Sequence, residues 1–215
     1  MRWNNMRAII LLIIIALTSC CKEEKAVPEE VVMFKKIPFD LANNFQDTIA
    51  LKINPVKDYQ YWAYVCFRQG MSGRESTAII KEGGDTLLKK NIKVKQDTYG
   101  FFQGGHPNFR CNYIVAVQDG REKLIDTDRG FREFLGTIDN LEEAVLLAIT
   151  YGYWLDSDIK GSAYRINNGN YEMHLLKFSS FPLQKESVEV IVIRDGFIKT
   201  SSLGVYCKNS KDCYE

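Results

Sequence analysis

The stretch AYRINNGNYEMHLLKF, residues 163–178, has the pattern of two β-strands joined by a tight turn. Asn168-Gly169 at its centre favours the positive φ angles of a two-residue hairpin turn. Such a turn pairs apolar residues across the two strands, Ile166 with Tyr171 and Tyr164 with Met173. Because these pairs share one face, the stretch predicts an antiparallel hairpin with one buried side.

Similar turn signals occur at two other places in the chain. Asp119-Gly120 lies inside CNYIVAVQDGREKLIDT, residues 111–127, and predicts a second hairpin. Asp195-Gly196 joins SVEVIVIR to FIKTSS and predicts that Ile193 pairs with Ile198. The chain therefore contains several strands that pair with their neighbours in sequence.

The segment DYQYWAYVCF, residues 58–67, is apolar on both faces of an alternating pattern. A strand of this kind is covered by other parts of the protein on both sides. Further candidate strands are residues 48–53, 77–81 and 87–94.

The pattern changes to a helical one in the middle of the chain. Residues 129–135 predict a short helix that is closed by Gly136. Asp139 and Glu142 have the spacing of a capping box, in which the first residue caps the helix and the second reaches back to it. This box predicts a longer, buried helix that ends near Tyr151 and Gly152.

These elements predict an α+β fold, an antiparallel, hairpin-rich sheet or sheets with one short and one longer buried helix in the middle of the chain. The hydrophobic content of 46% and the aromatic content of 12% are typical of a folded globular protein.

The amino terminus has the features of a secretory signal peptide. Arg2 and Arg7 precede AIILLIIIAL, residues 8–17, a run of ten apolar residues. A helix that crosses a bilayer needs about 20 such residues, so this run is too short to remain in the membrane.

Leu17-Thr18-Ser19-Cys20 follows this run and resembles the lipobox of bacterial lipoproteins. The resemblance implies that Cys20 is diacylglycerated, that cleavage follows Ser19, and that the freed amine of Cys20 is acylated. Shifting the frame to Cys21 removes the leading apolar residue, so Cys20 fits the motif better. We therefore expect a signal peptide at 1–19, a lipidated amino terminus and tether at 20–30, and a single globular domain at 31–215.

The resemblance also implies that the protein is located in the bacterial cell envelope. Two or more acyl chains anchor a protein stably, so the bilayer is an expected partner through Cys20. Cys21 is not the Asp that retains many lipoproteins at the inner membrane, which favours the outer membrane. Lys22-Glu23-Glu24-Lys25 also resembles the tags of some surface-exposed lipoproteins, although it equally suits a solvated tether.

The charge of the mature chain argues against nucleic acid as a partner. Removing residues 1–19 takes away Arg2 and Arg7, which leaves 26 basic and 27 acidic side chains and a formal charge of −1. Nucleic-acid affinity depends on many phosphate contacts from Lys and Arg, and no long basic run is present.

Four cysteines remain beyond the lipobox, and an exported chain meets an oxidising compartment. Cys207 and Cys213 enclose a short polar stretch, which predicts a local disulfide. The other pair would then be Cys66 with Cys111, but both lie in apolar strands, so two buried thiols are the alternative.

Candidate catalytic and metal-binding residues are few. His106 lies in a Gly/Pro loop five residues before Cys111 and could form a Cys–His pair, whereas His174 falls in a hairpin strand. Asp156-Ser157-Asp158 could bind calcium, but a turn between a helix and a strand explains it better. The sequence indicates no catalytic residues, no cofactor and no metal site.

Two aromatic clusters are the remaining candidates for a binding surface, Tyr61 with Trp62 and Tyr153 with Trp154. Exposed aromatic side chains bind sugars and protein partners, whereas buried ones belong to the core. Three functions follow as hypotheses. The favoured one is a non-catalytic lipoprotein that binds an envelope protein, and the alternatives are a glycan-binding module and a hydrolase that uses His106.

Overall fold

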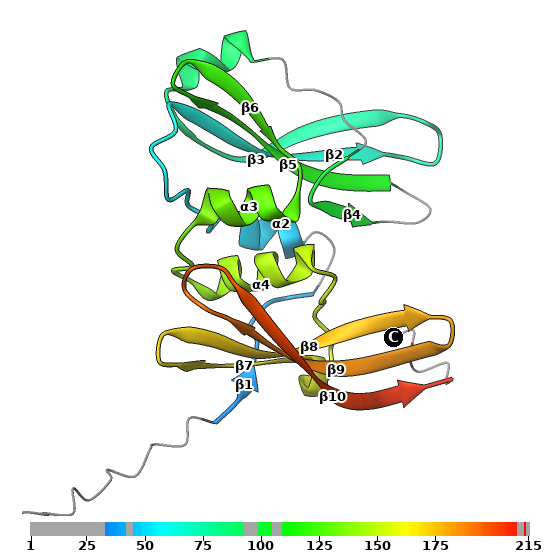
Figure 1. Cartoon of the computed structure of the whole chain (residues 1–215). Helices are drawn as coiled ribbons and strands as arrows, with labels where there is room; N and C mark the ends of the chain where they lie inside the picture. Colours follow the sequence, from blue (N-terminus) through cyan, green and yellow to red (C-terminus); the bar gives the residue numbers. More distant parts are fainter. Residues whose placement is uncertain (1–32, 42–44, 93–98, 105–108, 210–212, 214–215) are drawn as a thin grey trace, which may run out of the picture. The chain divides into compact units, whose positions relative to one another are not determined.

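Two antiparallel sheets of five strands each, with helices between them, make up the fold (Figure 1). The computed structural model describes residues 33–41, 45–92, 99–104, 109–209 and 213. The lipobox residues Ser19, Cys20 and Cys21 lie outside this range, as does the loop residue His106. The architecture confirms the predicted α+β class.

Sheet A has the strand order β1-β7-β8-β9-β10. Its strands are β1 (Lys35–Lys36), β7 (Ser162–Asn167), β8 (Asn170–Ser180), β9 (Leu183–Val192) and β10 (Ile198–Lys208). Asn168 and Gly169 join β7 to β8 with φ angles of 48° and 77°. The predicted register is confirmed, because Ile166 pairs with Tyr171 and Tyr164 with Met173.

The last hairpin of sheet A differs from its prediction by one residue. Ile198 pairs with Val192, and the Ile193 amide donates to the Phe197 carbonyl at 3.0 Å. The loop therefore has three residues, of which only Gly196 has a positive φ, 79°. A type I turn followed by a left-handed glycine is a common three-residue hairpin loop, so the predicted pairing of Ile193 with Ile198 was wrong.

Sheet B has β2 between β3 and β5, and β5 also pairs with β4 and β6. Its strands are β2 (Tyr61–Gln69), β3 (Glu75–Gly84), β4 (Phe102–Gly104), β5 (Phe109–Gln118) and β6 (Arg121–Ile125). Asp119 and Gly120, with φ angles of 53° and 70°, form the predicted turn between β5 and β6.

Strand β2 is buried on both faces, as its double apolar pattern predicted. Trp62 and Tyr64 belong to the large core that also contains the helices. Val65 and Phe67 belong to a smaller cluster on the opposite face, which partly buried Leu88 helps to cover.

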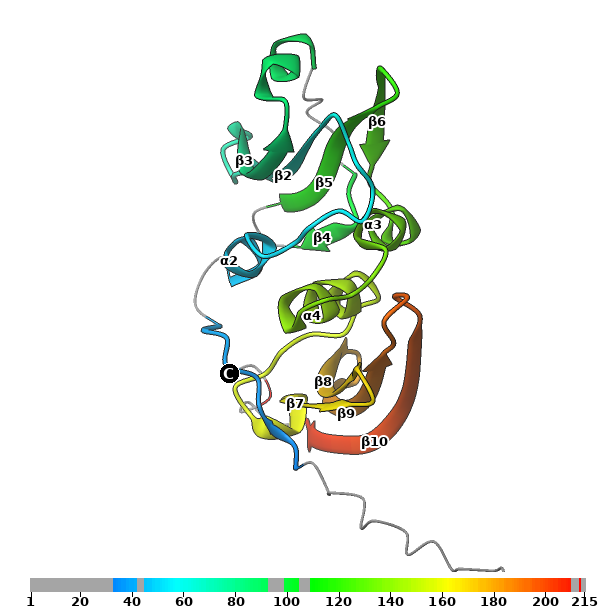
Figure 2. The ribbon, with the colours of Figure 1, turned by 90° about the vertical axis from the view of Figure 1, so that its left-hand side faces the viewer.

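The described residues form three α-helices, which lie between the sheets: α2 (Phe45–Ala50), α3 (Asp128–Leu135) and α4 (Leu141–Thr150) (Figure 2). The predicted short helix is confirmed by α3, which Gly136 closes with a φ of 64°. Among the described residues, no helix has both the length and the hydrophobicity needed to span a bilayer.

Two of the predicted strands are helical instead. Residues 45–50 form α2, in which Gln46, Ile49 and Ala50 have helical spacing and are all buried. Residues 86–91 form a 3₁₀ helix whose first turn Asp85 caps through the Leu87 amide at 2.9 Å.

The capping box of α4 is displaced by one residue from its prediction. Asn140, not Asp139, caps the helix by accepting from the Glu143 amide at 2.8 Å. Glu143, not Glu142, reaches back and accepts from the Asp139 amide at 3.0 Å. The second Glu143 oxygen accepts from the Asn54 amide at 2.9 Å, so this carboxylate also holds the loop before β2.

One hydrophobic core connects the two halves of the described chain. It contains Tyr64 and Ile114 from sheet B, Phe131 from α3, and Met173 and Val190 from sheet A. Residues Val32–Glu215 form one compact unit.

Candidate functional site

The face of sheet A that points away from the helices carries a buried polar cluster. The loop after α4 pairs with the edge of β8 just beyond the end of β7, where Trp154 exchanges two 2.8 Å backbone hydrogen bonds with Leu176. Asp156 follows in this loop and is only 5% exposed. The loop therefore brings a carboxylate onto the sheet.

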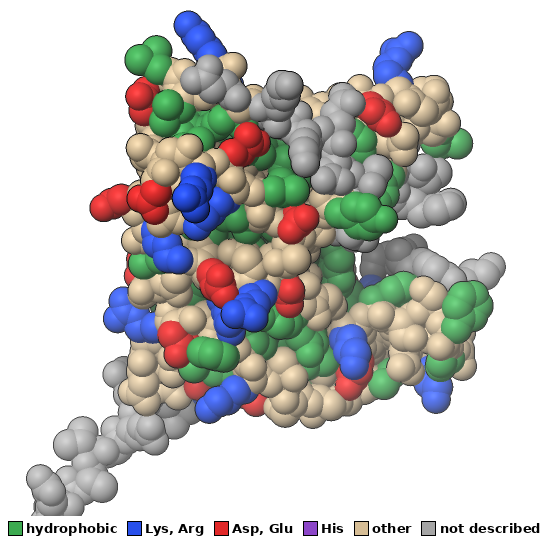
Figure 3. Space-filling view, turned by 45° about the horizontal axis from the view of Figure 1, so that its top comes forward, with side chains coloured by type: hydrophobic (Ala, Val, Ile, Leu, Met, Phe, Trp, Pro, Cys, Tyr) green, Lys and Arg blue, Asp and Glu red, His purple; other side chains and the backbone are tan. Residues whose placement is uncertain are grey.

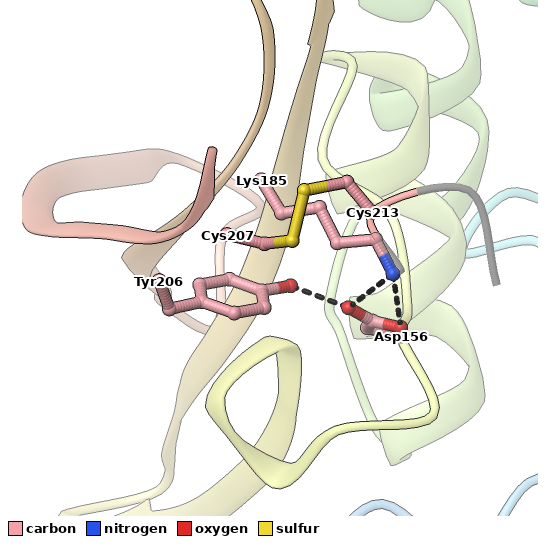
Figure 4. Close-up of a disulfide and its surroundings, with 5 residues drawn as sticks. All are labelled: Asp156, Lys185, Tyr206, Cys207 and Cys213. Carbon is pink, nitrogen blue, oxygen red and sulfur yellow. Dashed lines mark hydrogen bonds and ion pairs between the residues drawn. A yellow bond between two sulfur atoms is a disulfide. The ribbon is translucent and has the colours of Figure 1, made fainter. Parts of the chain in front are cut away.

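Asp156 is held by a cation, a phenol and a backbone amide (Figure 4). The ammonium group of Lys185, on β9, lies 3.2 Å from Asp156 Oδ2, and Lys185 is 7% exposed. The Tyr206 hydroxyl donates to Oδ2 at 2.5 Å, and the Ser157 amide donates to Oδ1 at 2.7 Å. The carboxylate is thus surrounded by donors, which is the arrangement that makes a buried charge tolerable.

These contacts determine the protonation states of the cluster. Burial raises the pKa of Asp156, but the hydrogen bonds from Tyr206 and Lys185 outweigh it and hold the pKa below its usual value. Burial raises the pKa of Tyr206, and the bond to the Asp156 carboxylate raises it further. At neutral pH the carboxylate is charged and the phenol neutral, so neither is suited to exchange protons with a substrate.

A β-bulge aims Tyr206 at Asp156. Val205 pairs with Glu186 and Cys207 pairs with Lys185, so Tyr206 is the extra residue on β10. Bulges of this kind redirect a side chain at the edge of a sheet. The same bulge places Cys207 beside Lys185.

The predicted disulfide between Cys207 and Cys213 is confirmed, with a Cα–Cα distance of 5.7 Å. Cys213 is 1% exposed and forms part of the wall of a pocket. The bridge therefore fastens Cys213 next to the Asp156 cluster (Figure 4).

The pocket has a volume of about 370 Å³. Most of its wall is apolar and comes from Leu41, Leu155, Leu176 and Phe178. Asp156, Ser157 and Lys185 form its polar part. Concave, mainly apolar sites with a few polar groups are typical binding sites.

Asp156-Ser157-Asp158 lies in the connection between α4 and β7, where the sequence favoured a turn. The Asp158 side chain caps the short 3₁₀ helix Ile159–Gly161 by accepting from the Lys160 amide at 2.9 Å. In the part of the chain that the structure describes, no three His, Cys, Asp or Glu side chains are grouped to hold a metal ion.

The predicted disulfide between Cys66 and Cys111 does not form. Cys66 is paired in register with Asn112, whereas Cys111 is paired with Phe67. Side chains of adjacent residues on a strand point to opposite faces, so the two thiols lie on opposite sides of sheet B. Both are buried, which agrees with the alternative of two buried thiols.

The aromatic clusters nominated as a binding surface are largely buried. Tyr61 is 1% exposed and Trp62 is 6% exposed, because both faces of β2 are covered. Tyr153 and Trp154 are half-buried and pack against the large core. The nominated surface was therefore wrong for the first pair, and the core interpretation applies to it.

His174 lies on the same outer face of sheet A as Asp156. Its ring stacks on Phe34, with 3.9 Å between the ring centroids. Burial holds the pKa of His174 below its ordinary value, and the charge of Arg165 adds to this shift, whereas Glu189 on the neighbouring strand opposes it. His174 therefore has a structural role, because its ring packs against Phe34 at the start of the domain.

Sequence reasoning missed Lys185 and Tyr206. They lie 29 and 50 residues from Asp156, and neither belongs to a spaced motif. The one local signal was the predicted disulfide at Cys207, the residue after Tyr206.

The surface charge is mixed on the face shown in Figure 3, where Lys and Arg alternate with Asp and Glu. Comparison with known proteins gives no match: no family model, no curated protein and no solved structure matches this chain.

Proposed function

We propose that the protein is a bacterial envelope lipoprotein, anchored in the outer membrane through acylated Cys20, whose domain binds a protein partner and does not catalyse a reaction. The anchor is supported by the lipobox-like Leu17-Thr18-Ser19-Cys20 and by the short apolar run before it.

The observation that carries the binding role is the pocket beside the disulfide. Its wall is mostly apolar, and its buried charges already compensate each other through the Asp156–Lys185 ion pair. A catalytic carboxylate needs a pKa near the working pH, whereas the pKa of Asp156 is held below its usual value. The site therefore suits recognition better than proton transfer.

The chemistry of the wall favours an apolar side chain of a partner protein as the occupant. Phe178 is 42% exposed and borders the pocket, so it can cover an inserted side chain. Aromatic anchors that fill pockets dominate the energy of protein interfaces. The glycan alternative loses its main support because Tyr61 and Trp62 are buried.

The anchor is tested by two matched substitutions in cells. Cys20→Ser should leave an unprocessed precursor or a soluble protein, whereas Cys21→Ser should still fractionate with membranes. Equal membrane fractionation of both processed variants would contradict lipidation at Cys20.

The binding role is tested by in-cell photocrosslinking. A photoreactive phenylalanine analogue at Phe178 should give one discrete protein adduct. The same analogue at Phe197, which is 55% exposed and precedes β10, should not. No adduct from Phe178, or the same adducts from both sites, would contradict a partner at the pocket.

A further inference from the structure

The disulfide contributes directly to the wall of the pocket. Cys213 is 1% exposed and lines the pocket together with Leu176 and Phe178 of β8. Cysteine behaves as a small apolar side chain, so Cys213 extends the apolar surface that an inserted side chain contacts. The position of Cys213 therefore affects the shape of the pocket.

The disulfide holds Cys213 against sheet A. The end of β10 is tied to β9 as far as Asn209, whose amide donates to the Leu183 carbonyl at 3.0 Å. Cys213 lies four residues further along the chain and is joined covalently to Cys207 of β10. Burial of a side chain as small as cysteine stabilises no more than the fixing of one residue's backbone costs, so Cys213 depends on the bond for its place.

The polar part of the pocket has contacts of its own. Asp156 is held by an ion pair with Lys185 and by a hydrogen bond from Tyr206. The Tyr206 hydroxyl also fits closely against Gly161, where an added Cβ would lie 2.8 Å from it. Opening the disulfide should therefore release Cys213 from the wall while the Asp156 cluster stays in place.

We propose that the Cys207–Cys213 disulfide is a redox switch for the pocket. With the bond formed, Cys213 completes the apolar wall and the side chain of the partner binds. With the bond reduced, Cys213 leaves the wall and the affinity for the partner falls. This inference rests on the proposed function, because it concerns the regulation of the same pocket.

The switch operates by thiol–disulfide exchange with a dithiol oxidoreductase of the envelope. Cys207 is partly exposed and Cys213 is buried, so the incoming thiolate attacks the Cys207 sulfur. Cys213 leaves as a thiolate and takes up a proton. The second thiol of the oxidoreductase then attacks the mixed disulfide and releases Cys207 as a thiol. Two electrons and two protons pass to this protein, and the oxidoreductase is left with a disulfide.

Alkylation of single cysteines tests the switch without any partner. In the full mature protein, Cys207→Ser leaves Cys213 as a thiol, and the buried Cys66 and Cys111 serve as references. Iodoacetamide is added under native conditions, and peptide mass mapping gives the rate at each cysteine. We expect Cys213 to react about tenfold faster than the two references, because it has left the wall. Equal rates at all three cysteines would overturn the switch.

Crosslinking in cells tests the effect on the partner. The photoreactive analogue at Phe178 is combined with Cys207→Ser or with Cys213→Ser, which break the same bond. The control is Lys208→Ser, which alters an exposed residue beside Cys207 and keeps the disulfide. We expect both cysteine variants to lose most of the discrete adduct, per amount of protein present, and the control to retain it.

Two other outcomes separate this inference from the proposed function. An undiminished adduct in the cysteine variants would overturn the switch and leave the proposed function standing. If Phe178 gives no adduct even with the disulfide intact, the proposed function fails and the switch fails with it.

The redox state of the protein in cells completes the test. Thiols are trapped with acid and then labelled with a mass-tagged maleimide, so the reduced form carries two more tags than the oxidised form. We expect both forms in the free protein and only the oxidised form in the Phe178 adduct. A protein that is oxidised throughout, or an adduct that contains the reduced form, would contradict the switch.

Discussion

Sheet A and sheet B have five strands each, but they are connected in different ways. In sheet A, β7, β8, β9 and β10 follow one another in sequence and in space. In sheet B, β2 pairs with β5, and Gln69 lies opposite Phe109, forty residues later. Four of the five strands of sheet A are therefore joined by local turns, whereas the central pair of sheet B, β2 with β5, joins distant segments.

The burial of the two sheets differs in the same way. Strand β2 is buried on both faces, so the centre of sheet B has no free surface. Sheet A packs one face against the helices, and its other face carries the Asp156 cluster and the pocket. In the proposed function, sheet B therefore serves as a scaffold and the outer face of sheet A binds the partner.

The largest loss of stability should come from a substitution in the core of sheet B. Phe67→Ala removes a side chain that is 1% exposed in the second cluster of sheet B, and should lower the free energy of unfolding by about 3–5 kcal/mol. Phe178→Ala on sheet A should cost much less, because Phe178 is 42% exposed. Urea unfolding measures both. Equal losses would contradict the division into scaffold and binding face.

The next effect should come from the buried ion pair. Lys185→Met leaves the Asp156 carboxylate buried without its cation, which should cost about 3 kcal/mol of unfolding free energy. Replacing both partners, as Lys185→Met with Asp156→Leu, should restore part of this loss. A single variant as stable as the wild type would show that the pair is dispensable.

The ion pair also predicts a dependence on pH. The pKa of Asp156 is lower in the folded protein than its ordinary value of 3.8, so the group binds a proton more readily when unfolded. The contribution of this carboxylate to the free energy of unfolding is fully present well above pH 3.8. It is lost as the pH falls through the pKa that Asp156 has in the folded protein. Unfolding curves of the wild type and of Asp156→Leu should therefore converge in stability below that pH.

A smaller effect should come from the disulfide. Cys207→Ser removes the disulfide that joins two cysteines six residues apart in the sequence. The loss should lower the free energy of unfolding by about 2 kcal/mol. A thiol reductant should destabilise the wild type by a similar amount and leave Cys207→Ser unchanged. Destabilisation of Cys207→Ser by the reductant would point to another disulfide in the chain.

The smallest effect should come from a turn of sheet A. Gly169 has a φ of 77°, and an alanine there should cost about 1 kcal/mol because its Cβ crowds the backbone. Gly70, in the connection of β2 to β3, has no positive φ, and a methyl group there would meet only the Arg74 carbonyl oxygen, at an ordinary 3.7 Å. Gly70→Ala is therefore the control, and thermal unfolding should distinguish the two variants.

Local features of the fold could be predicted from the sequence because their signals lie within a few residues. Asn168-Gly169 and Asp119-Gly120 determine two hairpins and their registers. The cap of α4 was misplaced by one residue because Asp139 and Asn140 are both good caps. Only the buried position of Glu143 distinguishes the two possibilities.

Features that depend on distant segments could not be predicted in the same way. The faces of Cys66 and Cys111 follow from the register between β2 and β5, which no turn dipeptide determines. The Asp156 cluster requires a loop, a strand and a bulged strand to meet. The burial of Trp62, by contrast, was already indicated by the double apolar pattern of its strand.

The central claim is that this domain acts from a membrane through lipid on Cys20. Intact-mass analysis of the mature protein from the envelope tests it most directly. We expect a chain that begins at Cys20 and carries acyl groups. A mature chain without any acyl addition would contradict the claim.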